Sequence, residues 1–200
     1  MATDFSKSMT KINLLKAFAG ESQARNRYTF AASCAKKNKQ FVLEAVFKFT
    51  AEQERAHAKV FYDFLKEFSG ENIQIDGTYP IDNYDNVEKL LKSAQHNEIQ
   101  EYETVYKGFA ETAEEEGFPQ ISAAFKNIAE IENTHAERFG NLAKLLSENK
   151  LFISDSSTKW MCLNCGYIFE GTQVPDQCPV CQHDKGYFIR VELAPYTAIQ

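Results

Sequence analysis

Four long segments of the chain carry apolar side chains at alternating steps of three and four residues, the spacing of one helix face. The segment from Pro119 to about Asn149 shows this pattern most clearly, because its steps alternate without a break. Its stripe consists of Ile121, Phe125, Ile128, Glu132, His135, Phe139, Leu142 and Leu146. A stripe of this kind is typical of a helix in a packed bundle.

Three further helices are predicted from the same spacing. They run from Thr10, a plausible N-cap, to about Asn38, from Phe41 to about Phe68, and from about Tyr84 to Glu116. The apolar stripe of the third contains Val87, Leu91, Ala94, Glu98, Glu101 and Val105. Residues 39–40 are too few for anything but a tight antiparallel turn. Residues 69–83 are rich in Gly, Asn and Asp and read as a crossover loop. The sequence therefore predicts a mostly α protein, a four-helix bundle with one long crossover.

The chain changes character after Lys150. Residues 154–158 (SDSST) read as a polar linker, and the remainder is short, aromatic and punctuated by Pro and Gly. We expect a small metal-stapled module at about 158–194, with a core of aromatic side chains. The predicted domains are a bundle at 1–153 and a cysteine domain at 154–200.

A sequence repeat lies in the second and fourth predicted helices. Residues 45–58 (AVFKFTAEQERAHA) and 123–136 (AAFKNIAEIENTHA) are identical at eight of fourteen positions, with an offset of 78. Each copy contains Glu-x-x-His, as Glu54 with His57 and as Glu132 with His135. Residues at i and i+3 lie on one face of a helix, so each copy presents both side chains together.

Every predicted helix carries an acid in its apolar stripe: Glu21, Glu54, Glu98 with Glu101, and Glu132. An unpaired buried carboxylate costs several kcal/mol, so a seam containing all of them needs compensating cations. Solvated helix faces are the simpler explanation for any single Glu, but not for acids that all lie in apolar stripes. Carboxylates and imidazoles without thiolates favour a pair of iron or manganese ions over zinc. Bundle sites of this type take single acids from two helices, here Glu21 and Glu98, and Glu-x-x-His from the other two. Glu101 is a terminal ligand, a proton donor or a surface charge.

The C-terminal region contains a second candidate metal site. Cys162 and Cys165 form one C-x-x-C pair, and Cys178 and Cys181 form another twelve residues later. Two such pairs predict a tetrahedral four-thiolate site for zinc or for a single iron. The fifth cysteine, Cys34, is most simply a small buried residue.

Composition narrows the functional classes. The chain has 200 residues and a formal charge of −6, which argues against nucleic-acid binding. It contains no apolar run near the ~18 residues that a membrane span needs. The N-terminus lacks the apolar stretch of a secretory signal, and the paired cysteines fit a reducing compartment. We therefore expect a cytoplasmic protein without a membrane anchor.

The Glu-x-x-His repeats, followed by a four-cysteine module, resemble the rubrerythrin family over essentially the whole chain. The resemblance implies a ferritin-like bundle and a diiron site, and the sequences Cys165-Gly166-Tyr167 and Cys178-Pro179 resemble rubredoxin, which favours iron in the cysteine site. By resemblance, the diiron ligands are Glu21, Glu54, His57, Glu98, Glu101, Glu132 and His135. The family is thought to exchange the acid matching Glu101 for the histidine matching His57 when the cluster is reduced.

Two tyrosines also match the family pattern, and one glutamine departs from it. Tyr28 and Tyr106 match tyrosines near the family's cluster, although Tyr102, four residues after Glu98, competes with Tyr106 on spacing. Gln182 departs from the rubredoxin pattern, which usually has Gly there, so the second cysteine loop is either strained or poorer in amide donors.

The resemblance implies a peroxidase that reduces hydrogen peroxide to water. Electrons would pass through the rubredoxin-like iron from an NAD(P)H-dependent reductase or a separate rubredoxin, and Glu101 would supply or steer the proton. The alternative is a ferritin-like ferroxidase that detoxifies iron. The bundle site should lie about 15–22 Å from a helix end, at about 1.5 Å per residue. Because that separation is long for transfer within one chain, we expect a homodimer or larger oligomer.

Overall fold

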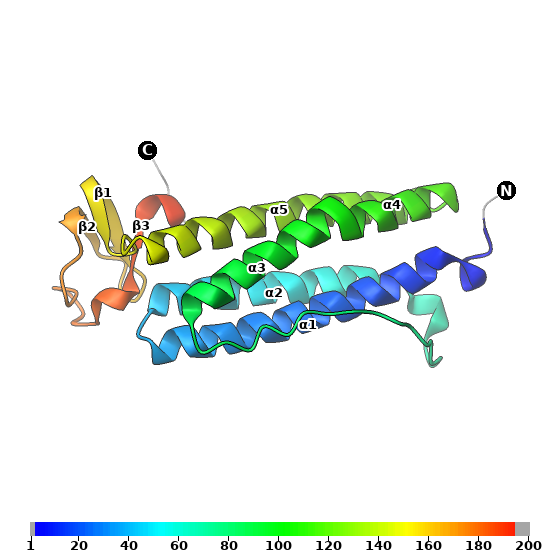
Figure 1. Ribbon diagram of the computed structural model, residues 1–200, viewed down its shortest axis with the longest axis horizontal. Coiled ribbons are helices and arrows are strands. Elements are labelled where there is room, and N and C mark those ends of the chain that lie inside the picture. The colour runs from blue at the N-terminus through cyan, green and yellow to red at the C-terminus, as the bar shows by residue number, and fades with distance from the viewer. Residues whose placement is uncertain (1–2, 195–200) are drawn as a thin grey trace.

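The computed structural model describes residues 3–194 as a long helical bundle with a small β-sheet domain at one end (Figure 1). The helical elements are α1 (Met9–Lys37), α2 (Phe41–Phe64), α3 (Val87–Gln100), a π-helical segment (Glu101–Val105), α4 (Tyr106–Glu115) and α5 (Pro119–Ser147). Short 3-10 helices cover Phe5–Lys7, Lys66–Phe68, Lys185–Tyr187 and Val191–Leu193. Within this part of the chain, no helix is both long and apolar enough to cross a membrane. α3, the π segment and α4 form one continuous helix, so the bundle has four long helices. This confirms the predicted fold class.

The four long helices form two antiparallel pairs. α1 packs mainly on α2, and α5 packs on α3 and α4. The turn between α1 and α2 places Lys39 at a φ of 56°, and the turn before α5 places Gly117 at 87°. Left-handed backbone of this kind ends a helix within a few residues and lets the chain reverse.

Helix α1 begins two residues earlier than expected. Its N-cap is Ser8, whose side chain accepts a hydrogen bond from Lys11 N at 3.1 Å, so the assignment of Thr10 as N-cap is wrong. Thr10 lies inside the helix, where its hydroxyl donates to Glu116 Oε2 at 2.6 Å. The same carboxylate accepts from the Met9 and Thr10 amides, which satisfies N–H groups that have no partner within the helix.

Two other helix boundaries differ from the prediction. α2 ends at Phe64, and a 3-10 helix at Lys66–Phe68 tightens the last turn before the crossover. The third helix starts at Val87 rather than near Tyr84, because the Asn86 side chain accepts from Lys89 N and caps it there.

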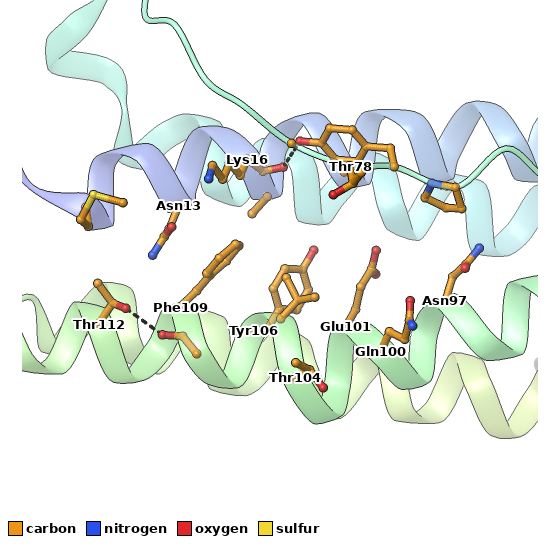
Figure 2. Close-up of a pocket in the computed structure, with 18 of the residues that line it drawn as sticks. Asn13, Lys16, Thr78, Asn97, Gln100, Glu101, Thr104, Tyr106, Phe109 and Thr112 are labelled. Carbon is orange, nitrogen blue, oxygen red and sulfur yellow. Dashed lines mark hydrogen bonds between the residues drawn. The ribbon is translucent and has the colours of Figure 1, made fainter.

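The crossover, residues 69–86, runs along α1 (Figure 1). It is attached to α1 by a Lys16–Asp76 ion pair at 3.0 Å and by the Tyr79 hydroxyl, which donates to the Lys16 carbonyl at 3.2 Å. Together with α1, the π segment and α4, it encloses a cavity of about 610 Å³ (Figure 2). Glu101 and Tyr106 line this cavity beneath the crossover.

The bundle core consists of two apolar clusters separated along the helix axis. The cluster nearer the β-sheet domain contains Phe47 and Phe139, whose ring centroids lie 5.4 Å apart. The other cluster contains Phe61 and Phe125 at 4.9 Å. These aromatic contacts join α2 to α5 on both sides of the middle of the bundle.

The C-terminal domain is a three-stranded antiparallel sheet with the order β2-β1-β3. Its strands are β1 (Ile153–Cys162), β2 (Ile168–Gln173) and β3 (Phe188–Arg190). Trp160 and Phe188 are fully buried, with the expected aromatic side chains Tyr167, Phe169 and Tyr187 packed around them. The prediction of a linker at 154–158 is wrong, because these residues form the exposed first half of β1. The register with β2 shifts between Ile153 and Thr158, and the side chains there are largely exposed, so the sequence shows no apolar alternation that would mark a strand.

The two cysteine loops have the same backbone shape but different residues at their turns. Gly166 has a φ of 77°, and Gln182 takes the equivalent place at 60°. Each donates its amide to the first cysteine of its loop, at 2.8 Å to Cys162 O and 2.9 Å to Cys178 O. Of the two possibilities for the second loop, strain or a missing amide donor, the structure shows strain. Gln182 still donates its backbone amide, but a residue with a side chain in the left-handed region costs about 1–2 kcal/mol.

The β-sheet domain packs directly on the α1–α2 turn. The Tyr187 ring stacks on Phe41 with centroids 4.3 Å apart. Gly186 is so close to this turn that a Cβ added to it would lie 1.9 Å from the Lys39 carbonyl oxygen. Arg190 donates to the Lys150 and Ile153 carbonyls at 3.2 and 2.8 Å, which fixes the connection after α5.

The close approach at Gly186 predicts that Gly186→Ala separates the two domains. The methyl group would overlap backbone that cannot rotate away, and overpacking of this kind costs about 1–3 kcal/mol. We expect faster proteolysis and amide exchange around residues 38–41, with the four-cysteine site intact. Gly108→Ala is the matched control, because an added Cβ meets nothing within 4 Å there. Equal exchange rates in the two variants would contradict the packing described here.

Candidate metal centres

The middle of the bundle, between the two apolar clusters, is filled by ionisable side chains. The residues that meet there are Glu21 of α1, Glu54 and His57 of α2, Glu98 of α3, and Glu132 and His135 of α5. None is more than 7 % exposed. Each belongs to a predicted apolar stripe, so the packing that buries the stripes also brings these side chains together.

The six residues form two overlapping groups, in each of which the candidate ligand atoms lie within 4.8 Å of one another. Glu21 and His57 belong to one group, Glu98 and His135 to the other, and Glu54 and Glu132 to both. The site thus has a pair of shared carboxylates and two terminal pairs, one on each side.

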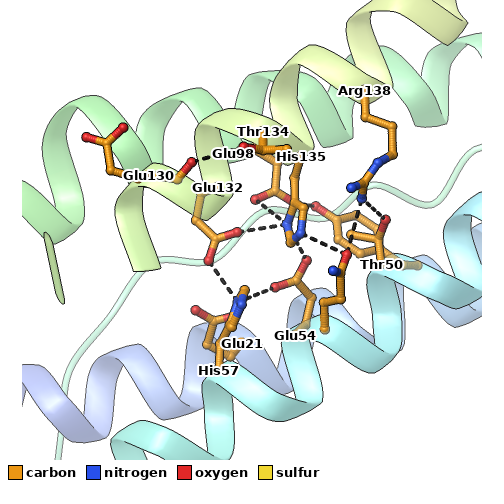
Figure 3. Close-up of polar contacts among 12 residues, drawn as sticks. Glu21, Thr50, Glu54, His57, Glu98, Glu130, Glu132, Thr134, His135 and Arg138 are labelled. Carbon is orange, nitrogen blue, oxygen red and sulfur yellow. Dashed lines mark hydrogen bonds and ion pairs between the residues drawn. The ribbon is translucent and has the colours of Figure 1, made fainter. Parts of the chain in front are cut away.

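The shared carboxylates turn one oxygen toward each imidazole (Figure 3). Glu132 places Oε1 2.9 Å from His57 Nδ1 and Oε2 2.9 Å from His135 Nδ1. Glu54 repeats this arrangement at 3.1 Å to each ring. Two carboxylates whose oxygens diverge toward two separate centres have the geometry of bridging ligands of a dinuclear site.

Two tyrosines donate hydrogen bonds to the terminal carboxylates. The Tyr28 hydroxyl donates to Glu98 Oε1, and the Tyr106 hydroxyl donates to Glu21 Oε1. Tyr102 instead packs at the edge of the apolar cluster around Phe61. Burial, followed by the nearby carboxylates, raises the pKa of both Tyr28 and Tyr106 well above the ordinary value, so both keep their protons.

The π segment explains why Tyr106 is the residue that points inward. A π-helical turn contains one more residue than an α-helical turn. Tyr106 therefore occupies the place that Val105 would hold in a regular helix, seven residues after Glu98 on the same face. The expected stripe position of Val105 is wrong for this reason, since Val105 is only half-buried and Tyr106 is 2 % exposed.

Four buried carboxylates outnumber the two imidazoles, and the pKa values reflect the imbalance. Burial and repulsion from Glu132 raise the pKa of Glu21 well above normal, and burial and Glu54 do the same for Glu98. Burial opposes the charge on His57, but hydrogen bonds with Glu132, Glu21 and Glu54 outweigh it and raise its pKa to about 12. Without metal, the cluster therefore holds several protons that a cation must displace.

The donor set fits metal ions. Both oxygens of Glu132 and the His135 Nδ1 atom are buried, and within residues 3–194 their polar contacts are the ion pairs inside the cluster itself. The same holds for one oxygen each of Glu21, Glu54 and Glu98. Buried oxygen and imidazole atoms that converge in this way suit iron or manganese, and two such ions would neutralise the carboxylates.

Glu101 lies beside the cluster but in neither of the two groups. It begins the π segment and lines the cavity under the crossover (Figure 2). Burial, with repulsion from Glu132 and Glu54, raises its pKa to about 8. This carboxyl group therefore carries a proton near neutral pH at the boundary between the cavity and the cluster.

The four cysteines of the C-terminal domain also meet. Their sulfur atoms lie within 4.8 Å of one another, with Cys162 and Cys181 at 3.7 Å and Cys165 and Cys178 at 3.7 Å. A backbone amide hydrogen bond from His183 lowers the pKa of Cys181 to about 6, whereas burial raises that of Cys162 to about 12. Four convergent thiols close a tetrahedral site and leave no open position for a substrate.

Three residues of the site had not been anticipated. Gln53 Oε1 contacts His135 Nε2 and accepts a hydrogen bond from Arg138, and Arg138 also donates to the Thr50 hydroxyl (Figure 3). Gln53 and Arg138 lie beside the apolar stripes and Thr50 lies within the stripe of the second helix, so the spacing alone does not show that these residues contact one another.

Comparison with known proteins identifies both parts of the chain. The family profile of rubrerythrin matches residues 13–143, and that of the rubrerythrin rubredoxin-like domain matches residues 160–189. Rubrerythrin-1 of Clostridium acetobutylicum is 46 % identical over 181 residues, which cover 90 % of this chain and 92 % of the relative. Rubrerythrin of Clostridium perfringens is 44 % identical over 180 residues, with the same two coverages.

A solved structure agrees with these sequence matches. The fully reduced, all-ferrous state of nigerythrin superposes with a TM-score of 0.62 at 26 % identity, and covers 94 % of this chain and 92 % of that one. The bundle cluster and the four-cysteine cluster are thus the diiron carboxylate site and the rubredoxin-like site of a known architecture. The chain belongs to the rubrerythrin family.

Proposed function

We propose that this redox protein is a non-haem diiron peroxidase that reduces hydrogen peroxide to water. The observation that carries the proposal is the pairing of two unlike sites in one chain. The four-thiolate site is closed and can only pass electrons, whereas the carboxylate site adjoins a cavity of about 610 Å³. A site that delivers single electrons beside a site open to a small substrate has the composition of a reductase.

The geometry suggests a role for each residue of the bundle site. Glu54 and Glu132 would bridge the two iron ions, with Glu21 and His57 on one side and Glu98 and His135 on the other. When bound, the two irons supply the two electrons that cleavage of the peroxide O–O bond requires. Tyr28 and Tyr106 hold Glu98 and Glu21 in place by hydrogen bonds that their raised pKa values keep intact.

Reduction of hydrogen peroxide to two waters also consumes two protons. Glu101 is placed to supply one, because its carboxyl group lines the cavity and its pKa of about 8 keeps it protonated at neutral pH. General acid groups work best when their pKa lies near the working pH. The crossover, attached to α1 through Tyr79 and Asp76, forms one wall of this cavity.

The electron path is proposed to run between chains. His135 lies twelve residues before the end of α5 at Ser147, about 18 Å at about 1.5 Å per residue, and the cysteine domain lies beyond that end (Figure 1). A homodimer or larger oligomer would bring the cysteine domain of one copy, residues 154–200, to the bundle of another, residues 1–153. Residues 1–2 of the bundle range and 195–200 of the cysteine-domain range lie outside the described residues. Iron in the cysteine site would take electrons from a rubredoxin or an NAD(P)H-dependent reductase.

Peroxide consumption by the reconstituted protein tests this function. We expect NAD(P)H-coupled turnover with peroxide when a reductase and the iron-loaded protein are present, and loss of that turnover when zinc replaces iron in the cysteine site. A protein that oxidises and stores added Fe²⁺ with oxygen but reduces no peroxide would be a ferroxidase instead, and the proposal would be wrong.

Glu101→Gln isolates the proton donor. The amide keeps the size of the side chain but cannot donate an acid proton, so peroxide turnover should fall about 100-fold, the usual scale for general acid catalysis. Iron content measured alongside separates this role from that of a ligand: it should stay unchanged if the six residues of the two groups hold the ions, and fall if Glu101 is the ligand that the resemblance implies. Glu103→Gln is the matched control, an exposed residue of the same π segment. Unchanged turnover in Glu101→Gln would remove this role.

The excess of buried acids predicts that folding stability depends on pH in opposite directions in the metal-free and the metal-loaded protein. Glu21, Glu98 and Glu101 have raised pKa values, so the folded metal-free chain binds more protons than the unfolded chain above about pH 4.5. Between pH 5.5 and 8 its stability therefore falls as the pH rises. The raised pKa of His57 acts in the same direction above about pH 6.5.

Metal binding displaces these protons, so the stability of the loaded protein should rise over the same range. Thermal unfolding at pH 5.5 and 8, with and without metal, measures both slopes. One pKa unit is worth about 1.4 kcal/mol, and 1 kcal/mol shifts Tm by about 2–4 °C in a chain of this size. A metal-free protein that is more stable at pH 8 than at pH 5.5 would contradict the electrostatics described above.

A further inference from the structure

The two imidazoles of the cluster differ in what their outer nitrogens contact. His135 Nε2 lies 3.1 Å from Gln53 Oε1. Arg138 Nη1 donates to the same oxygen at 3.2 Å and to the Thr50 hydroxyl at 3.1 Å (Figure 3). The Arg138 guanidinium also lies over the Phe49 ring, 5.4 Å from its centroid. Arg138 is thus held at three points, and Gln53 joins it to the imidazole.

Chemistry identifies which atoms donate and which accept in the hydrogen bonds that link Arg138, Gln53 and His135. An arginine side chain only donates hydrogen bonds, so the Gln53 atom that faces Arg138 must be its oxygen. That oxygen also faces His135, so Nε2 must carry a proton and donate it. Nδ1, which lies 2.9 Å from Glu132 and 3.1 Å from Glu54, is then the nitrogen left to bind a metal.

The other half of the repeat lacks this device. At the offset of 78 residues, Gln53 corresponds to Ile131, Thr50 to Ile128 and Arg138 to Val60. None of these apolar side chains can accept or donate a hydrogen bond. Within residues 3–194, the polar contacts of the His57 ring all run through Nδ1, to Glu21, Glu54 and Glu132.

We propose that Gln53 and Arg138 are positioning residues that hold His135 in the Nε2-protonated tautomer, so that its Nδ1 is a fixed ligand. The inference rests on the diiron site and not on the reduction of peroxide. Hydrogen bonds to the outer nitrogen of a metal-bound histidine fix its ring and tune its basicity, and their loss typically lowers metal affinity about 10- to 100-fold. The repeat therefore builds one tethered imidazole and one that is held only from the cluster side.

Anaerobic Fe²⁺ titration of the full chain tests this proposal, with Mössbauer spectra and the reduction potential of the diiron site as further readouts. Gln53→Leu removes the acceptor with little change in volume. It should lower the affinity of one of the two irons about 10- to 100-fold and alter one of the two ferrous signals. Arg138→Leu should move the same signal, because the amide is then free to rotate.

Two variants separate positioning from a general effect on folding. Gln53→Glu keeps an acceptor for Nε2–H, so it should restore binding of both irons and lower the potential, because a carboxylate makes the imidazole more basic. Arg55→Leu is the matched control, since Arg55 is exposed on α2 and pairs with Glu52. It should change neither affinity nor spectrum.

Full affinity and an unchanged spectrum in Gln53→Leu would overturn the proposal. So would a loss in Gln53→Leu that Gln53→Glu does not restore, since that pattern indicates a packing role. A protein that binds iron as predicted but reduces no peroxide would instead contradict the proposed peroxidase and leave this inference standing.

Discussion

The structure depends on the burial of four carboxylates in the seam of a helical bundle. Glu21, Glu54, Glu98 and Glu132 are each at most 1 % exposed, and two imidazoles can balance only half of their charge. Protons or metal ions must supply the remainder, because an uncompensated buried charge costs several kcal/mol. The apolar clusters on either side hold the helices at the spacing that keeps these side chains together. Metal binding therefore contributes to folding stability, because the metal ions compensate the charge of the buried carboxylates.

Unequal surroundings convert the symmetric repeat into an asymmetric site. The two copies supply matching ligands, and the shared carboxylates face both imidazoles at equal distances. The surroundings differ, since Gln53 and Arg138 tether His135, whereas Glu101 lies beside the cluster with a proton at neutral pH. The repeat thus accounts for how the chain holds two ions, and the residues outside it account for how the two positions come to differ.

The sequence predicted the bundle and the convergent acids because both follow from helical periodicity. It did not predict the π segment, because that segment begins at Glu101 and the apolar stripe before Glu101 has regular α-helical spacing. The consequence appears only at Tyr106, which replaces Val105 on the buried face. Gln53 and Arg138 escaped notice because they contact one another across two helices. The sequence does not distinguish the first half of β1 from a linker, because an exposed strand needs no apolar alternation.

The contact between the domains bears on how electrons reach the cluster. Stacking of Tyr187 on Phe41, and the approach of Gly186 to the Lys39 carbonyl, leave no room for the cysteine domain to pivot at this point. The four-cysteine site is therefore held at the end of its own bundle and cannot swing toward its own carboxylates. A rigid domain in that position would, on the proposed function, have to deliver its electrons to the carboxylate site of another copy. On the proposed function, the packing at one glycine would thus make the oligomer a requirement of turnover.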